Sequence, residues 1–422
     1  MVTESPIRQN ESHDVPEGWK TVEIQDFSSV VTGGTPSTFV AEYWGGDIRW
    51  MNSGELNDKK IRDVEGRITS LGLENSSTRL IPERCVLIGL AGQGKTRGTV
   101  AINLVPLCVN QSIAAILPNE SFVPEFLYYS LDNRYEEIRA MSTGASGRGA
   151  LNLGIIRRIP VDMPQRIEEQ SEIARVLSDV DGLIETFGEL IAKKKSIKQG
   201  VMQELLTGRR RLSGFHNDWK PETLGQVFQI LSSASKPWAE LSEAGSIGYI
   251  HYGDVHTVVS PFLDCSKIEL PRIERSKVSD IPLVKDGDLV MVNASEDYAG
   301  IGKSVEIRNV EGKEIVAGLH TFLLRGDPKH LANGFKGYLQ FIPQVKEGLI
   351  MRSTGISVYG ISKSGIKEVE VMLPDVDEQT AIAKVLFDMD AETEELVRER
   401  QKYVLIRQGM MQQLLTGRIR LR

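Results

Sequence analysis

Apolar residues repeat with helical spacing in the segment after residue 166. Their intervals alternate between four and three residues, as in the seam of a coiled coil, through Ile173, Leu177, Val180, Ile184, Phe187 and Ile191. The pattern predicts a continuous helix over residues 168–206, about 58 Å long at 1.5 Å per residue. An isolated helix of this length with one apolar stripe needs a partner that covers the stripe.

This segment is repeated near residue 422. Gln203–Leu212 returns as Gln412–Leu421, 209 residues later, and the same offset aligns the residues upstream. An internal match of this extent indicates a duplicated unit. The second copy starts the same apolar seam but carries Thr393 and Arg400 where the seam would continue. We predict that the two helices pack against each other in antiparallel orientation, under an approximate two-fold axis.

A strand-rich body precedes each helical segment, opening with Trp19-Lys20 in one case and with Trp219-Lys220 in the other. Short apolar runs broken by Gly, Asn, Pro and Asp are typical of strands joined by turns. A helix is predicted from Pro124 to Ile138, because proline favours the first helical turn. In the first body the predicted strands are Ile48–Asn52, Cys85–Leu90, Thr99–Asn103, Ile113–Leu117 and Arg158–Met163.

These elements predict an α+β fold with two similar strand-rich α/β domains. Residues 1–165 form the first body and residues 213–374 form the second body. The helical segments 166–212 and 375–422 separate them as an antiparallel coiled coil with pseudo-two-fold symmetry. The bodies share three short stretches, which we align as Trp50–Leu56 with Tyr249–Val255, Gly92–Thr96 with Gly300–Ser304, and Ser142–Gly144 with Ser353–Gly355.

Composition and charge narrow the class of protein. With 422 residues, 41% apolar and 25% charged, the chain is typical of a soluble globular protein of two to three domains. The polar N-terminus, the short apolar runs and three scattered cysteines predict no secretory signal, membrane span or disulfide framework. We therefore expect a cytoplasmic protein with reduced thiols.

The net charge of −7 disfavours a freestanding nucleic-acid binder, since phosphate contacts need Lys and Arg. The distribution of charge qualifies this view, because residues 84–119, 138–161 and 348–367 contain no acidic side chain. These segments are either local basic surfaces or buried strands with stray charges.

Gly89–Thr96 matches the GxxxxGK[ST] pattern of a phosphate-binding loop. That motif requires a helix to begin at its Lys-Thr pair, so that the helix N-terminus meets the phosphates. Arg97–Ile102 follows instead, a β-branched stretch that predicts a returning strand, and the second body has Asp297 in place of the first glycine. The loop is better interpreted as a basic hairpin tip that approaches DNA, or as a plain surface turn.

Motifs for catalysis are missing from the sequence. It has no Asn/Asp-Pro-Pro-aromatic motif of a methyltransferase, and the lysines after Pro374-Asp375 lack the spacing of a nuclease site. The six histidines show no metal-ligand spacing, and His251, His256 and His320 can be ordinary core or surface residues. We predict no catalytic residue, no metal site and no cofactor.

The motif Glu-Gln-x-x-Ile-Ala-x-Val-Leu-x-Asp-x-Asp begins at both Glu169 and Glu378, and each helical segment ends in Leu-Leu-Thr-Gly-Arg. With the Trp-Lys openings, these motifs resemble the DNA-specificity subunit of type I restriction–modification enzymes, over nearly the whole chain. The resemblance implies a non-enzymatic subunit of a restriction system in which each body, a target recognition domain, reads half of a bipartite double-stranded DNA target. It also implies that the helices set the half-site spacing.

The same resemblance implies two methyltransferase subunits as partners, with restriction and translocase subunits joining through the complex and no membrane. The residues expected to bind these partners are Glu169, Gln170, Leu205, Leu206, Glu378, Gln379, Leu414 and Leu415. A stand-alone two-headed DNA-binding protein is the alternative.

Candidate DNA contacts are polar, basic or aromatic residues on predicted loops. In the first body they are Arg49, Asn52, Gln93, Lys95, Thr96, Arg97 and Arg148. In the second body they are His251, Tyr252, Tyr298, Lys303, Ser304, Arg352 and Tyr359. The alternative for the three tyrosines is packing beneath a loop.

Overall fold

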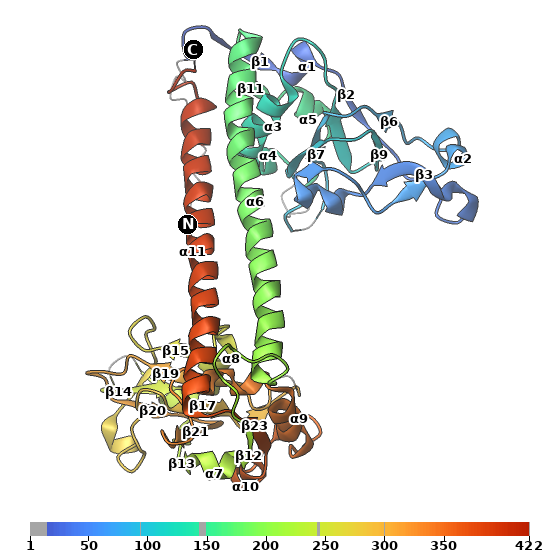
Figure 1. Cartoon of the computed structure of the whole chain (residues 1–422). Coiled ribbons are helices and arrows are strands. Elements are labelled where there is room, and N and C mark those ends of the chain that lie inside the picture. Colours follow the sequence, from blue (N-terminus) through green and yellow to red (C-terminus); the bar gives the residue numbers. More distant parts are fainter. Residues whose placement is uncertain (1–14, 93, 143–148, 243–244, 299, 422) are drawn as a thin grey trace. The chain divides into compact units, whose positions relative to one another are not determined.

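The computed structural model describes residues 15–92, 94–142, 149–242, 245–298 and 300–421 (Figure 1). Contacts divide the chain into two compact units. Unit 1 comprises Met1–Gly188 and Arg398–Arg422, and unit 2 comprises Glu189–Val397. Each unit therefore holds one body, the adjoining part of one long helix and the far part of the other, whereas the sequence suggested four consecutive segments.

In the described part of the first body the strands form three sheets. Its opening strand β1 (Trp19–Glu23) pairs antiparallel with its last strand β11 (Pro160–Pro164). The central five-stranded sheet has the order β2 (Val30–Thr32), β10 (Ile113–Ile116), β7 (Val86–Gly89), β8 (Val100–Asn103) and β4 (Lys60–Ile61). A four-stranded sheet has the order β5 (Arg67–Ile68), β3 (Trp44–Met51), β9 (Leu107–Val109) and β6 (Leu80–Ile81). The five predicted strands are confirmed as β3, β7, β8, β10 and β11.

The helices of the first body are short and cover the sheets. They are α1 (Ile24–Phe27), η1 (Ala41–Tyr43), η2 (Ser53–Asp58), α2 (Ser70–Glu74), α3 (Pro124–Asp132), α4 (Tyr135–Ala140) and α5 (Leu153–Arg157). The predicted helix from Pro124 begins as expected but is interrupted after Asp132. Arg134 leaves the helical conformation, and its guanidinium donates to the carbonyl oxygen of Pro160 at 2.5 Å, which turns the chain before α4.

The second body repeats this plan. Strand β12 (Lys220–Thr223) pairs with β23 (Glu370–Leu373). The central sheet has the order β13 (Phe228–Leu231), β21 (Thr321–Gly326), β17 (Leu289–Val292), β19 (Ser304–Arg308) and β15 (Phe262–Asp264). Smaller sheets join β16 (Arg272–Ile273), β14 (Ile247–Ile250) and β20 (Ile315–Ala317), and β18 (Ala294–Ser295) with β22 (Tyr359–Gly360). The helices are α7 (Leu224–Val227), η3 (Trp238–Glu240), α8 (Tyr252–Thr257), η4 (Arg275–Lys277), η5 (Lys336–Phe341), α9 (Pro343–Met351) and α10 (Lys363–Lys367).

Strand register corrects one alignment made from the sequence. The hairpin of the first body closes with Gly98 N–H donating to Gly89, and that of the second body closes with Gly302 N–H donating to Val292. Both closing glycines have positive φ, 81° and 71°, which favours glycine. Gly98 therefore corresponds to Gly302, and the alignment of Gly92–Thr96 with Gly300–Ser304 is wrong by four residues. The shared Gly-x-Gly-Lys letters were misleading because they precede the closing glycine in the first body and include it in the second.

Two long helices, α6 (Ile167–Leu206) and α11 (Val376–Leu414), pair antiparallel inside each unit. In unit 1 the ring of Phe187 stacks on Tyr403 with centroids 5.5 Å apart. In unit 2 Lys194 contacts Glu392 at 2.6 Å, and Lys198 contacts Asp390 at 2.5 Å. The predicted helix and the antiparallel pairing are therefore confirmed.

The cores explain why the helices are shared between the units. Ile173 and Leu177, the first seam positions of α6, are fully buried against the sheets of the first body. The same core contains Met411, Leu414 and Leu415 from the end of α11. The core of the second body likewise takes residues from the beginning of α11 and the end of α6. Each body is thus completed by both helices.

Among the described residues, no helix combines the length and the apolar character needed to cross a membrane.

Candidate nucleic-acid interface

A capped short helix lies at the same place in both bodies. In the first body the side chain of Asn52 accepts a hydrogen bond from Gly54 N–H at 2.8 Å, and Glu55 accepts from Asn52 N–H at 2.8 Å. This capping box starts η2 directly after β3. The side-chain oxygen of Asn52 is therefore occupied by the backbone of Gly54, and its amide nitrogen also donates to Glu55 at 2.8 Å, so both ends of the side chain are engaged within the box.

The second body forms the same box with a histidine. The Nδ1 atom of His251 accepts from Gly253 N–H at 3.3 Å, and Asp254 accepts from His251 N–H at 2.7 Å. Burial lowers the pKa of His251, so the neutral imidazole that can accept this bond is favoured. Asn52 and His251 therefore share a capping role that the sequence did not indicate.

Beside η2, the first-body hairpin carries basic residues. Lys95 is exposed, and its carbonyl oxygen accepts from Thr99 Oγ1 at 2.5 Å and from Tyr135 Oη at 3.1 Å. The guanidinium of Arg139 donates to the carbonyl oxygen of Arg97 at 3.3 Å and to Tyr135 Oη at 2.9 Å. These bonds bring Lys95, Arg97 and Arg139 together at one end of the sheet. Tyr135 and Arg139 were not proposed as contacts, although Arg139 lies in an acid-free segment.

The hairpin is not a phosphate-binding loop. After the half-buried Thr96 the chain turns at Gly98 and enters strand β8 instead of a helix. A phosphate-binding loop depends on the N–H groups of a helix that begins at this point. The geometry therefore agrees with the hairpin interpretation of the sequence.

In the second body, α8 and the equivalent hairpin carry aromatic residues. The ring of Tyr252 lies 4.4 Å from His251, 6.0 Å from His256 and 5.5 Å from His320. Lys303 Nζ donates to the carbonyl oxygen of His256 at 2.6 Å, which joins the hairpin to α8. The structure thus brings His251, Tyr252 and Lys303 together. The neighbouring Ser304 is only 1% exposed, so burial removes it from the surface available to DNA.

A second group of predicted residues lies at the loop of the same hairpin and on strand β22. The rings of Tyr298 and Tyr359 stack with centroids 3.9 Å apart, and β22 pairs Tyr359 with Ser295 of β18. Tyr298 is 49% exposed, so it does not pack beneath a loop. Arg352, partly exposed, has its Nε atom 3.7 Å from Glu368.

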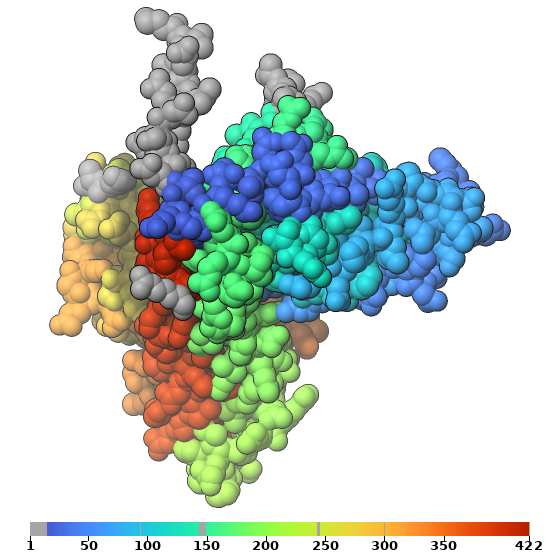
Figure 2. All heavy atoms as spheres, turned by 90° about the horizontal axis from the view of Figure 1, so that it is seen from above, coloured from blue at the N-terminus to red at the C-terminus, as the bar shows by residue number. Residues whose placement is uncertain are grey.

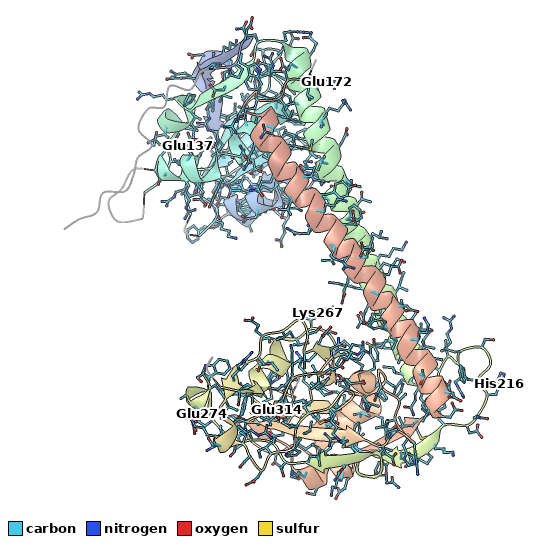
Figure 3. All side chains as sticks on the ribbon, turned by 90° about the vertical axis from the view of Figure 1, so that its left-hand side faces the viewer. Glu137, Glu172, His216, Lys267, Glu274 and Glu314 are labelled. Atoms are coloured by element: carbon cyan, nitrogen blue, oxygen red, sulfur yellow. The ribbon has the colours of Figure 1, made fainter. Side chains whose placement is uncertain are left out.

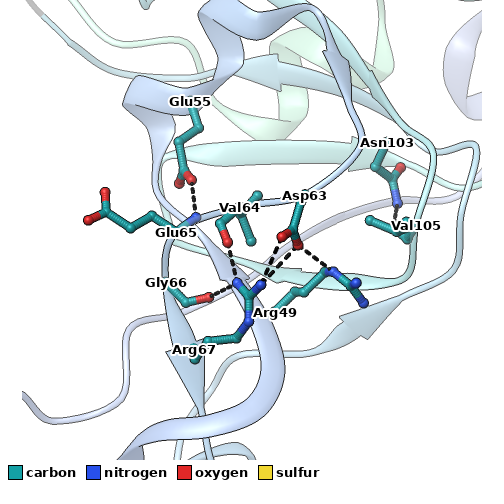
Figure 4. Close-up of polar contacts among 9 residues, drawn as sticks. All are labelled: Arg49, Glu55, Asp63, Val64, Glu65, Gly66, Arg67, Asn103 and Val105. Atoms are coloured by element: carbon teal, nitrogen blue, oxygen red, sulfur yellow. Dashed lines mark hydrogen bonds and ion pairs between the residues drawn. The ribbon is translucent and has the colours of Figure 1, made fainter.

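Arg49 lies apart from this group and is held by an acidic partner (Figure 4). Its Nε atom donates to Asp63 at 2.7 Å, and Arg67 binds the same carboxylate at 2.9 Å and 3.0 Å. These bonds, that from Arg49 foremost, lower the pKa of Asp63. Two guanidinium groups around one carboxylate leave Arg49 less free for a phosphate than Lys95. The predicted contacts Gln93 and Arg148 lie outside the described residues.

A cleft of about 1350 Å³ opens elsewhere in the second body, where Lys267 and Glu314 can be followed in Figure 3. Side chains of both signs line it, namely Asp254, Glu269, Glu314, Lys267, Arg272 and Lys313. Mixed charge of this kind does not favour a polyanion, so we do not assign the cleft to DNA. Among the described residues, no group of His, Cys, Asp and Glu is arranged to hold a metal ion.

The residues expected to bind partners are held inside the chain instead. Glu169, 6% exposed, receives two bonds from Arg420 at 2.5 Å and 2.7 Å and one from Trp19 Nε1 at 3.4 Å. Arg420 also donates to the carbonyl oxygen of Glu17. Figure 2 shows the red end of α11 against the blue opening segment of the first body. Glu169 therefore fastens the end of one helical segment to the beginning of the other.

Unit 2 contains an equivalent set of bonds around one buried glutamate, and each of these two sets is called a clasp below. Glu378 receives bonds from Arg211 at 2.5 Å and 2.6 Å and from Trp219 Nε1 at 3.2 Å. The burial of the remaining predicted partner residues has a similar cause. Two are glutamines that bond to the backbone of their own body, and the others are leucines in the cores: Gln170, Gln379, Leu205, Leu206, Leu414 and Leu415. All eight side chains are thus enclosed by the chain itself.

Comparison with known proteins agrees with the duplicated architecture. The family model for the type I restriction modification DNA specificity domain matches residues 16–194 and again residues 216–405. The MjaVIII specificity subunit of a type I restriction enzyme from Methanocaldococcus jannaschii is 24% identical over 97% of this chain and 94% of that protein. The MjaIX specificity subunit from the same organism is 28% identical over 56% of this chain and 58% of that protein.

Solved structures show the same fold. The S subunit of a type I restriction-modification system from M. genitalium superposes with a TM-score of 0.58 at 15% identity, covering 96% of this chain and 98% of that one. A chain from a structural study of assembly of the type I R-M system gives 0.60 at 16% identity, covering 96% and 99%. With two matches to the family model that together cover most of its length, the chain belongs to the family of type I restriction modification DNA specificity domains.

Proposed function

We propose that this chain is the DNA-specificity subunit of a type I restriction-modification complex, and that each body reads one half of a bipartite double-stranded target. The observation that carries the proposal is the duplicated site. Both bodies place a capped short helix beside a hairpin closed by a left-handed glycine, with Lys95 and Lys303 on the hairpins. Two equivalent pairs of helix and hairpin that carry different side chains suit two half-sites of different sequence.

The long helices have two proposed roles. Since α6 and α11 each run without a break from one unit into the other, they are suited to fix the spacing between the half-sites. They are also suited to dock two methyltransferase subunits. Exposed apolar side chains support this, with Leu190 and Ile197 in unit 2 and Leu405 and Ile406 in unit 1. Methylation and cleavage then belong to the methyltransferase and restriction subunits, and this chain, working in the cytoplasm, supplies no catalytic group.

The proposal is tested by mapping methylated sites in a host that carries the chain with its methyltransferase. Exchanging residues 1–165 for another such body should change one half of the methylated sequence and leave the other half unchanged. A chimera that alters both halves would contradict independent reading. A chain that binds its site alone, at full affinity in moderate salt, would favour the stand-alone DNA-binding protein.

The proposed role of the long helices in setting the half-site spacing has its own test. Inserting a helical turn of residues beside Leu206 should lengthen the spacer between the two half-sites and leave the bases read unchanged. Unchanged spacing with altered bases would remove the helices from this role.

A further inference from the structure

A narrow hairpin on the second body presents apolar side chains to solvent. Thr354 and Gly360 exchange two backbone hydrogen bonds, of 2.9 Å and 2.8 Å, and so close a turn of five residues between them. Gly355 has a φ of 140°, and a Cβ atom there would lie 1.9 Å from the carbonyl oxygen of Val358. The turn is therefore tight. At its tip Ile356 is 93% exposed and Val358 is 55% exposed.

The base of this hairpin is fixed to the candidate interface. Strand β22 pairs Tyr359 with Ser295, and Tyr359 stacks on Tyr298 at the hairpin that carries Lys303. Exposed Lys363 and partly exposed Arg352 follow and precede the tip in the chain, and Arg352 has its Nε atom 3.7 Å from Glu368. The tip is therefore continuous with the hairpin that carries Tyr298 and Lys303, and this position favours DNA over a protein surface as the occupant.

The side chain of an exposed isoleucine cannot form hydrogen bonds with base edges, so any contact that it makes with a base must be apolar. The major groove admits a two-stranded ribbon, and the only apolar feature of the natural base pairs there is the C5-methyl group of thymine. We propose that Ile356, supported by Val358, contacts a thymine methyl group in the half-site read by the second body. This inference rests on the proposed function and adds an apolar specificity contact to the polar ones.

The test uses the full chain assembled with its methyltransferase subunits and a duplex that carries the mapped target. The half-site of the second body is identified first, as the half that changes when this body is exchanged. Each thymine in that half-site is then replaced, one at a time, by deoxyuridine, which lacks only the methyl group. Competition binding is measured for the unmodified protein and for Ile356→Ala. At one position we expect a loss of about fourfold with the unmodified protein, as for one methyl group returned to water.

With Ile356→Ala the same replacement should have no effect, because the contact is already gone. Met372→Ala, at a 38% exposed residue on β23, serves as the matched control and should keep the fourfold response. A half-site without a thymine, or a deoxyuridine effect of equal size in the unmodified protein and in Ile356→Ala, would overturn the inference. So would a variant that loses its methyltransferase instead of base preference.

The two levels of the argument fail differently. If exchanging the second body leaves both half-sites unchanged, the proposed function fails. If the exchange redefines one half-site while every thymine replacement is neutral, only the role of Ile356 fails.

Discussion

Removing Arg211 tests whether the clasp at Glu378 holds unit 2 together. The carboxylate of Glu378 has a side-chain exposure of 1%, and Arg211 binds both of its oxygen atoms. This hydrogen bonding also raises the pKa of Arg211. In Arg211→Ala the carboxylate would stay buried, with Trp219 Nε1 at 3.2 Å as a remaining donor.

The expected magnitude follows from this geometry. Breaking a buried ion pair by removing one partner costs about 3–5 kcal/mol, because an uncompensated charge stays in the interior. The side chain of Arg211 is itself 26% exposed, so water can reach part of the vacated site. We therefore expect the lower end, about 3 kcal/mol, or roughly a hundredfold in the local opening equilibrium.

Hydrogen exchange measured by mass spectrometry is the suitable assay. A chain with two units has no single free energy of unfolding, whereas exchange reports each segment separately. Peptides that contain β12 and the first turns of α11 should exchange about a hundredfold faster in Arg211→Ala, while β1 and β11 of unit 1 keep their rates.

The neighbouring Arg210 provides the matched control. It lies 3.6 Å from Glu204, with side-chain exposures of 68% and 50%, so Arg210→Ala should change local stability by less than about 1 kcal/mol. Adding Glu378→Gln to Arg211→Ala should recover most of the loss, since a neutral amide needs no counter-charge. Equal exchange in Arg211→Ala and Arg210→Ala would refute the clasp.

Three further predictions concern single side chains. Since burial lowers the pKa of His251, the folded state binds a proton less readily than the unfolded state, and stability should fall as the pH drops below about 6.5. His251→Asn copies the cap of Asn52 and should remove this part of the pH dependence, measured by exchange of α8 between pH 5 and 8. Tyr129→Phe removes a hydrogen bond of 2.8 Å to the carboxylate of Asp181 and should destabilise unit 1 by about 1.5–3 kcal/mol, and unchanged exchange of α3 would contradict this. Lys95→Ala should weaken DNA binding by the assembled complex and reduce its salt dependence by about one ion, while saturable ATP binding by the unmodified chain would revive the phosphate-loop interpretation.

The long helices and the buried strands could be predicted from the sequence because their patterns are local. The seam of α6 repeats every three and four residues, and β7, β8 and β10 are short apolar runs bounded by turn residues. The duplication added a second, independent reading of the same helix. These features depend on neighbours within about two turns of helix or one strand, which periodicity reports well.

Features that depend on distant residues could not be predicted. Glu169 and Arg420 are 251 residues apart, so nothing near Glu169 showed that its charge is used inside the chain. The hairpin register depended on which glycine closes each loop, and similar letters concealed the shift between Gly98 and Gly302. Ile356 has no distinguishing signal in the sequence, because an apolar residue is normally expected inside a protein, and only its exposure singles it out.

The order of synthesis gives the composition of unit 1 a further meaning. The ribosome makes the first body early, but the core of that body also needs Met411, Leu414 and Leu415, which are made only after all of unit 2. Unit 2 meets no such delay, because Leu205 and Leu206 precede the second body in the chain. The half of the protein that emerges first is therefore the half that is finished last, and until then its apolar face stays open to chaperones or to misassembly.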